Sequence, residues 1–376
     1  SAPFRRREDE RKSDPKKPGR GSGHPGSCRK VPEVIDEEIE VPLTGCPHCA
    51  GVLEGVIPVV QYIEELPEVR PHVTRLKTYE GHCPRCDQMV RSTHARQTSH
   101  AGGCAGVQLG ARALAVAAEL KHGMGLTLRK TCQSLKRFCN LQISAGGLAQ
   151  AFQRMAGKLA AEEAALIDRL AQAPVVHSDE TSWWKNSTSC SLWVFATPGS
   201  EGLTLYRVVD HRDRATFHDI LLPDYPGLLI SDCLSVYDGA TAHQHKCYAH
   251  HLKALKVAQR DQSPSRAAVE DWVGRARAFF EDAMALKKQL PELDEPEAQT
   301  HRVLLESRAN ALFANPRGDP AQERFRNRIA KQRDHLLSFL DHPQAEATNN
   351  LAERQLRGAV IAGQTHLIVY DFFQSI

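Results

Sequence analysis

Hydrophobic positions change their spacing twice along the chain, which divides it into a helical part, a strand-rich part and a second helical part. Over residues 108–173, apolar side chains recur at helical spacing, with a break at Gly123-Met124-Gly125. Thr127 and Ser144 are suitable N-caps for two successive helices, and Asn140 lies in the turn between them, where a left-handed backbone is often needed. The pattern predicts a helix-turn-helix, although an ordinary helical hairpin shares it.

Segments rich in β-branched and aromatic residues follow Pro174 and predict three sequential strands, over residues 175–184, 191–197 and 203–209. A helix is expected over 214–222, and the apolar run from Gly227 to Asp232 is typical of a strand buried on both faces of a sheet. The resulting βββαβ order predicts a multidomain α/β protein in which Asp179 lies on the first strand and Asp232 ends the fourth. Ligands collect at the carboxyl ends of parallel strands.

A charged stretch over residues 254–341 predicts a helical insertion, with helices around residues 266–290, 298–313 and 321–340, and a further helix starts near Thr348-Asn349-Asn350. This last helix carries Glu353. With Asn350 as the N-cap, Glu353 is placed to close a capping box or to pair with Arg357 at i,i+4. The local pattern alone therefore favours a structural role for Glu353.

Composition is that of a globular protein: 376 residues with 41% hydrophobic and 25% charged side chains are enough for two or three domains. No apolar run approaches the roughly 18 residues of a membrane helix. The basic start of the sequence is not followed by the apolar stretch of a signal peptide. We therefore expect a cytoplasmic protein with no membrane partner.

The net charge of +3 conceals a strongly basic start. Residues 1–31 carry ten Lys or Arg against four Asp or Glu, in a Gly- and Pro-rich stretch that is unable to fold alone. Lys16, Lys17 and Arg20 are predicted to contact DNA phosphates as part of a flexible arm. A solubilising terminus is the alternative.

Four of the eleven cysteines form two CPxC pairs, Cys46 with Cys49 and Cys83 with Cys86. In a large chain expected in the cytoplasm, such pairs suit metal ligation better than disulfides, and C-x2-C spacing lets two thiolates bind one tetrahedral Zn²⁺. We expect one structural zinc site built from all four, with a β-hairpin formed by residues 55–66 and 73–79 between the pairs. Two unrelated thiol pairs or a redox pair are the alternatives.

Taken together, several motifs resemble those of bacterial transposases of insertion-sequence family sixty-six. They are the Gly23-His24-Pro25-Gly26 end of the arm, the CPxC pairs, the helix-turn-helix, Asp179-Glu180-Thr181, Ser231-Asp232 with Tyr237-Asp238-Gly239, Cys247-Tyr248-Ala249-His250 and Thr348-Asn349-Asn350-Leu351-Ala352-Glu353-Arg354. The resemblance covers nearly the whole chain, with the motifs in the family's order. It implies a ribonuclease-H-like catalytic core with a helical insertion and an acidic (DDE) triad of Asp179, Asp232 and Glu353.

The resemblance also implies a chemistry. The triad would hold two Mg²⁺ (or Mn²⁺) ions for DNA cleavage and strand transfer, and His250 would contact the scissile phosphate or orient a metal-bound water. A structural role for the Cys247 and His250 pair is the alternative. Because neighbours on a strand point to opposite faces, Glu180 is not expected to join the triad. Base edges would be contacted by residues of the second helix, namely Gln150, Gln153 and Arg154.

The expected partners are double-stranded DNA, as element ends and as target, and further copies of the chain on DNA in the bacterial nucleoid. The expected parts are a basic arm (1–31), a zinc-binding domain (32–105), a helical DNA-binding region (106–173), the first part of the core (174–253), the helical insertion (254–341) and a final catalytic helix with an atypical C-terminus (342–376). The 19 residues after Arg357 lack the Lys and Arg of the family. A decayed copy that only binds DNA is therefore an alternative, as is a metal-dependent nuclease or resolvase.

Overall fold

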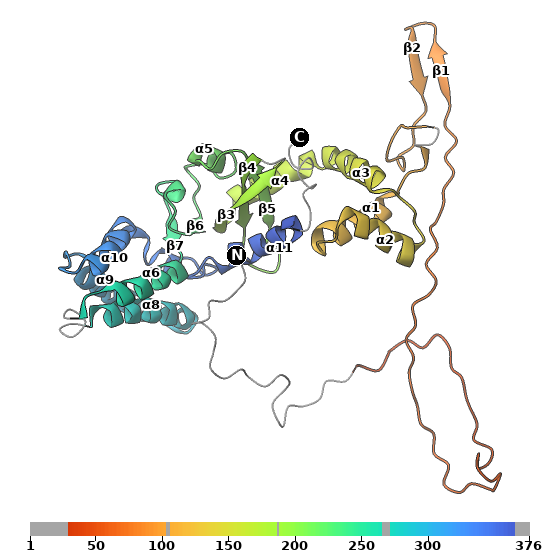
Figure 1. The fold of residues 1–376 in the computed structure, drawn as a ribbon, viewed down its shortest axis with the longest axis horizontal. Helices are drawn as coiled ribbons and strands as arrows, with labels where there is room; N and C mark the ends of the chain where they lie inside the picture. The colour runs from red at the N-terminus through yellow and green to blue at the C-terminus, as the bar shows by residue number, and fades with distance from the viewer. Residues whose placement is uncertain (1–28, 103–105, 186–187, 265–270, 365–376) are drawn as a thin grey trace. The chain divides into compact units, whose positions relative to one another are not determined.

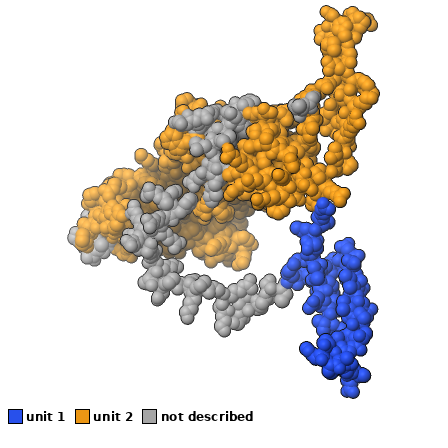
Figure 2. Space-filling model, turned by 45° about the vertical axis from the view of Figure 1, so that its right-hand side comes forward, with its two compact units in different colours: residues 1–68 blue, residues 69–376 orange. Residues whose placement is uncertain are grey.

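The structure, a computed structural model, describes residues 29–102, 106–185, 188–264 and 271–364. The chain divides into two compact units, residues 1–68 and 69–376, which Figure 2 colours separately. In the first unit, the described residues form no helix or strand, and most of their large apolar side chains are exposed. None of the helices in the described ranges combines the length and the apolar character needed to span a membrane.

An antiparallel hairpin, β1 (Glu80–Cys83) and β2 (Gln88–Arg91), opens the regular structure of the second unit. The hairpin predicted over residues 55–66 and 73–79 is wrong, because neither segment contains a strand. Apolar side chains in those segments stay in solvent, with Ile57 75% and Val73 85% exposed, so no packed face stabilises strands there. The turn of the second CPxC pair joins β1 to β2 instead.

A group of helices follows, made of α1 (Ala111–Ala118) with a π-helical turn (Glu119–Gly123), α2 (Leu128–Cys139), α3 (Ala145–Lys158) and α4 (Ala160–Ala171) (Figure 1). The predicted caps are confirmed: Thr127 Oγ1 accepts a hydrogen bond from the N–H of Lys130 at 2.8 Å, and Ser144 caps α3 in the same way. Asn140 adopts the predicted left-handed conformation, with φ of 56°. A shared core holds α1, α2 and α3 together, formed by Ala117, Leu135, Leu148 and Phe152.

A five-stranded mixed sheet follows these helices. Its strands are β3 (Val175–Lys185), β4 (Thr188–Ala196), β5 (Thr204–Val209), β6 (Leu228–Ser231) and β7 (Gln244–Lys246), with α5 (Arg214–His218) before β6. The order across the sheet is β5-β4-β3-β6-β7, in which β3, β4 and β5 pair antiparallel and β3, β6 and β7 pair parallel. The predicted βββαβ order is confirmed. The sequence pattern misses β7 because its three residues are polar, although all three are buried.

Helices cover both faces of the sheet. One face packs against α4 and α5 through a cluster that includes Val176 and Phe217. The opposite face packs against α11 (Asn350–Gln364), where Ala352 and Leu356 share a cluster with Val194 of β4. We call this second face the α11 face. It is the face on which the acidic residues of the candidate site lie.

The helical insertion lies between β7 and α11 in the sequence and consists of α6 (Tyr248–Asp261), α8 (Trp272–Gln289), α9 (Glu295–Phe313) and α10 (Pro320–Lys331). Its aromatic side chains, such as Phe280 and Phe313, form one hydrophobic core with Val175 and Ile230 of the sheet. The helix predicted to reach Leu340 is too long. It ends at Lys331 and gives way to short 3-10 turns, which return Leu336, Phe339 and Leu340 to the core.

Candidate active site

Two of the predicted catalytic residues belong to neighbouring strands: Asp179 lies within β3, and Asp232 directly follows the end of β6. In the parallel pairing of β3 with β6, His177 is opposite Ile230, and Asp179 and Asp232 each follow two residues later. Side chains two residues apart on a strand share a face, so this register directs both carboxylates to one face. It is the α11 face, because Asp179 is paired with Val194 of β4, which packs against α11. Both aspartates are half-buried.

The third predicted residue, Glu353, reaches the same face from the first turn of α11. The N–H of Glu353 donates to the backbone oxygen of Asn349 at 3.2 Å, and the helix begins at Asn350. Asn350 is therefore the first helical residue and not the predicted N-cap, which removes the capping box as an account of Glu353. Its Oε1 atom lies 3.9 Å from Nδ1 of His250.

Asn349 fixes the start of α11 against the sheet. Its side chain is fully buried, and Nδ2 donates to the backbone oxygen of Ser178 at 2.8 Å. Its Oδ1 accepts a hydrogen bond at 3.2 Å from Nδ1 of His177, since an amide oxygen is only an acceptor. The backbone N–H of Asn349 donates to Sγ of Cys247 at 3.1 Å. Sequence reasoning missed this residue: the Asn-Asn pair before α11 was the signal, but the pattern assigned the cap to Asn350.

Negative charge accumulates around Asp179. Burial is the main cause that raises the pKa of its carboxyl group to about 7, and the charges of Glu180, Asp232 and Glu353 raise the pKa further. The N–H of Glu180, which donates to Asp179 Oδ1 at 3.0 Å, acts in the opposite direction. Carboxylates gathered in this way are the hard oxygen donors that Mg²⁺ and Mn²⁺ prefer, so the donor set fits a divalent cation.

His250 and Cys247 lie beside Glu353 at the start of α6. Potential ligand atoms of Cys247, His250 and Glu353 are all within 4.8 Å of one another. The carboxylate oxygens of Asp179, Asp232 and Glu353 are not all within this distance of one another. Burial raises the pKa of the Cys247 thiol, which favours its neutral form. The His250 Nδ1 atom is buried and has no hydrogen-bond partner in the described part of the chain, so it remains available to a ligand.

Glu180 points to the other face of the sheet, as strand alternation predicts. Its side chain is completely buried there, where it accepts hydrogen bonds from the hydroxyl group of Tyr237 and from the guanidinium group of Arg212. Glu180 thus has an ion pair and a hydrogen bond of its own on that face, whereas Asp179 lies near other carboxylates.

A family model described as Transposase IS66 family matches residues 106–370, well over half of the chain. The chain belongs to the IS66 family of transposases. A comparison with curated proteins finds no match. The region matched to the IS66 family contains Asp179, Asp232 and Glu353, together with the helices α1 to α4, and begins after both CPxC pairs.

The two CPxC pairs of this IS66 family chain fall in different units, and each has the same local geometry. The residue after the second cysteine is left-handed in both, with φ of 59° at Ala50 and 53° at Asp87. Backbone N–H groups of the turn lower the pKa of Cys46 in the first pair and of Cys83 in the second. All four cysteines are free thiols, so neither pair is a disulfide. Each turn thus favours the thiolate form that zinc requires.

The predicted base-contacting residues of the IS66 family chain lie on the exposed side of α3. Gln150, Gln153 and Arg154 are all exposed, whereas Leu148 and Phe152 of the same helix are buried in the core of this helical group. The predicted phosphate-contacting residues of the basic arm lie outside the described residues; they are Lys16, Lys17 and Arg20.

Proposed function

We propose that this IS66 family chain is a DDE transposase that cleaves the ends of an insertion sequence and joins them to target DNA. The observation that carries the proposal is the placement of Asp179, Asp232 and Glu353 on one face of the sheet, from two adjacent parallel strands and the helix α11. Three antiparallel strands followed by two parallel ones, in the order β5-β4-β3-β6-β7, support a ribonuclease-H-like core.

Asp179, Asp232 and Glu353 would hold the divalent ions, Mg²⁺ or Mn²⁺. Two such ions supply Lewis acidity to the attacking and leaving oxygens of a phosphodiester. The protein's part is to hold the three carboxylates in place and to release the proton of Asp179, whose pKa of about 7 allows this near neutral pH. Asn349 and His177 hold Glu353 at the sheet through the start of α11.

His250 would contact the scissile phosphate. Its Nδ1 atom is buried without a partner in the described part of the chain and lies 3.9 Å from Glu353 Oε1, so a group that enters between them finds a donor beside a carboxylate. The N–H of an imidazole donates to a phosphate oxygen, while the carboxylate fixes the orientation of the ring.

DNA recognition would be divided between two parts of the chain. The α2 and α3 pair would act as a helix-turn-helix that presents Gln150, Gln153 and Arg154 to base edges. The basic arm would contribute sequence-independent phosphate contacts, and one structural Zn²⁺ on the four CPxC thiolates would order the region before α1. Further copies of the chain would assemble with it on DNA.

The decisive experiment is a strand-transfer assay with the purified full chain, Mg²⁺ and DNA that carries the inverted repeats flanking the coding sequence. We expect joined products from the wild type and none from Asp179→Ala, Asp232→Ala or Glu353→Ala, with DNA binding retained. Asp168→Ala is the matched control, because Asp168 is exposed on α4, which packs against the opposite face of the sheet. Nicking without joining would identify a nuclease or resolvase, and binding without either would identify an inactive copy.

A further inference from the structure

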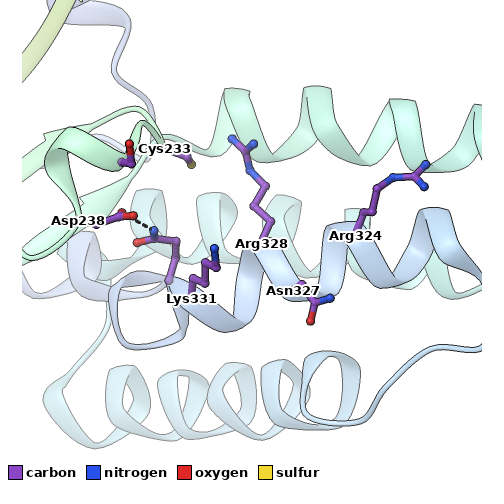
Figure 3. Close-up of a pocket in the computed structure, with 8 residues that line it drawn as sticks. Cys233, Asp238, Arg324, Asn327, Arg328 and Lys331 are labelled. Atoms are coloured by element: carbon purple, nitrogen blue, oxygen red, sulfur yellow. Dashed lines mark hydrogen bonds between the residues drawn. The ribbon is translucent and has the colours of Figure 1, made fainter. Parts of the chain in front are cut away.

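A cavity of about 400 Å³ lies between the loop that follows β6 and the helix α10 of the insertion (Figure 3). The loop contributes Cys233, Ser235 and Asp238 to its lining. The helix contributes Arg324, Arg328 and Lys331, together with Asn327 and Gln332. The cavity is thus bounded on one side by the segment that carries Asp232 and on the other by a basic helix.

The cations of α10 form a single row. Arg324, Arg328 and Lys331 are spaced i, i+4, i+7, which places them on one side of a helix, and Figure 3 shows all three rising from the same side of α10. Phe325 and Ile329 of the same helix are buried in the hydrophobic core. Core packing therefore fixes which side of α10 the row occupies.

The lining carries more positive than negative charge. Its one carboxylate belongs to Asp238, whose Oδ1 accepts a hydrogen bond from Nε2 of Gln332 at 3.0 Å. Arg324 lies at the 4.0 Å limit of an ion pair with Asp261, which Arg260 already binds at 2.8 Å. In the described part of the chain, three cations therefore face one anion in this cavity.

Two of the three cations have unused capacity for binding. Arg328 is half-buried, and its Nε atom is buried without a hydrogen-bond partner in the described ranges. Lys331 is exposed and has no ion pair with any described residue. A buried guanidinium nitrogen without an acceptor is costly unless a ligand supplies one.

The row is longer than one phosphate group. Seven residues at 1.5 Å per residue place Arg324 and Lys331 about 10 Å apart along the axis of α10. Successive phosphates of one DNA strand rise about 3.4 Å along the duplex axis and are further apart along the strand itself, so a row of this length reaches more than one of them. The spread of the cations therefore suits a nucleic-acid backbone better than an isolated phosphate ion.

We propose that this cavity, which we call the α10 cleft, binds the phosphate backbone of DNA beside the segment that is held at Asp179, Asp232 and Glu353. Cys233 of its lining directly follows Asp232, so a backbone seated in the α10 cleft continues towards the carboxylates. The inserted helices are then a further DNA-binding surface, separate from the arm and from α3. The inference rests on the proposed function, since it names how that function's substrate is held.

Paired substitutions of exposed residues test the proposal without disturbing the core. The cleft variant is Arg324→Gln with Lys331→Gln, and the matched control is Lys256→Gln with Lys288→Gln, which removes the same charge from exposed positions on other helices of the insertion. Binding of the full chain to a fluorescent 40-base-pair duplex of arbitrary sequence is measured over a range of salt concentrations. Affinity falls as salt rises, and each phosphate that the protein no longer neutralises makes the plot of log affinity against log salt less steep by ~0.9.

The cleft variant should bind more weakly, and its salt dependence should be less steep by about 1 to 2, while the control keeps the wild-type slope. Equal slopes for the wild type and the cleft variant would overturn the proposal. A second result would also overturn it: inorganic phosphate raises the melting temperature of the wild type but not of the cleft variant, and the two proteins bind DNA equally well. That result would assign the cleft to a free anion.

A second measurement does not depend on affinity. The photo-crosslinking residue p-benzoylphenylalanine replaces Asn327, an exposed residue of the cleft lining, and in a separate protein replaces Lys288. We expect light-dependent crosslinks to the duplex from position 327 that clearly exceed those from position 288. Crosslinking at 327 that is no stronger than at 288 would contradict the proposal.

Strand transfer by the same proteins separates this inference from the proposed function. A wild type that joins DNA, together with a cleft variant that binds and crosslinks like it, would refute the α10 cleft and leave the transposase assignment intact. Loss of DNA binding confined to the cleft variant, in a chain that joins no DNA, would support the cleft and reject the catalytic proposal. A wild type that binds no DNA would reject both.

Discussion

Nδ2 of Asn349 donates a 2.8 Å hydrogen bond to the backbone oxygen of Ser178, the residue immediately before Asp179. The contact joins two segments that are 171 residues apart in sequence. Because Asn349 also precedes α11, it relates the position of Glu353 to that of Asp179. One amide group thereby sets the spacing between two of the proposed metal ligands.

Replacing Asn349 should damage both stability and catalysis. Asn349→Ala leaves the backbone oxygen of Ser178 and Nδ1 of the His177 ring buried without the partners they have in the wild type, at a cost of about 1–3 kcal/mol for each group. We expect a lower melting temperature and a fall in strand transfer that exceeds any change in DNA affinity. Asn350→Ala is the control, since Asn350 is exposed at the start of the same helix. Equal losses in the two variants would contradict the positioning role.

The raised pKa of Asp179 predicts an unusual pH dependence of the metal-free protein. With a folded-state pKa of about 7 and an ordinary unfolded value, the folded state binds more protons between about pH 4 and 7. The unfolding free energy should therefore fall as pH rises through this window, by up to ~1.4 kcal/mol per pH unit. Asp179→Asn should remove this fall, measured by denaturant unfolding in a chelator.

Magnesium supplies the complementary measurement. Binding of Mg²⁺ requires the ionised carboxylate, so Mg²⁺ should raise the melting temperature of the wild type more at pH 8 than at pH 5. Asp179→Asn should respond little at either pH. A wild type and a variant with identical pH profiles and identical responses to Mg²⁺ would count against Asp179 as a ligand.

The CPxC pairs predict one bound zinc ion per chain. Metal analysis should find it in the wild type and not after Cys46→Ser or Cys83→Ser, whereas Cys132→Ser in α2 should retain it. Chelation should increase hydrogen exchange over residues 40–95 and leave the sheet protected, because such sites stabilise locally. A wild type without zinc would reject the site.

The basic arm and α3 should contribute differently to DNA binding. Neutralising Lys16, Lys17 and Arg20 should weaken binding to all duplexes and flatten the salt slope by ~0.9 for each phosphate that the arm no longer neutralises. Changing Gln150 and Gln153 to alanine should reduce preference for the element's ends more than general affinity. Both are measured by competition between end-containing and arbitrary duplexes. The same effect from both sets of changes would show that α3 does not read sequence.

Local chemistry explains why so much of the fold was predictable. The caps at Thr127 and Ser144 and the left-handed Asn140 depend on neighbours within three or four residues, so the sequence pattern locates them correctly. The apolar run of β6 likewise identifies a strand covered on both faces. The hairpin over residues 55–66 and 73–79 fails for the opposite reason, because alternation alone does not create a face to bury.

The site was harder to predict because its contacts are distant in sequence. Helix periodicity gave Glu353 a capping role, and only the packing of α11 on β3 and β4 brings it to Asp179. Asn349 and the row on α10 have the same origin: their significance depends on what lies opposite them. The resemblance of motifs, not local pattern, selected the triad.

The placement of Glu353 also sets the order in which the centre is completed during synthesis. Asp179 and Asp232 leave the ribosome first, and 121 residues separate Asp232 from Glu353. At about 5–20 residues per second, this interval takes roughly 6–24 s. The helices α1 to α4 precede the core and are made before the last acidic residue appears, so a nascent chain gains the helices that are proposed to read DNA before it gains the last of its proposed metal ligands.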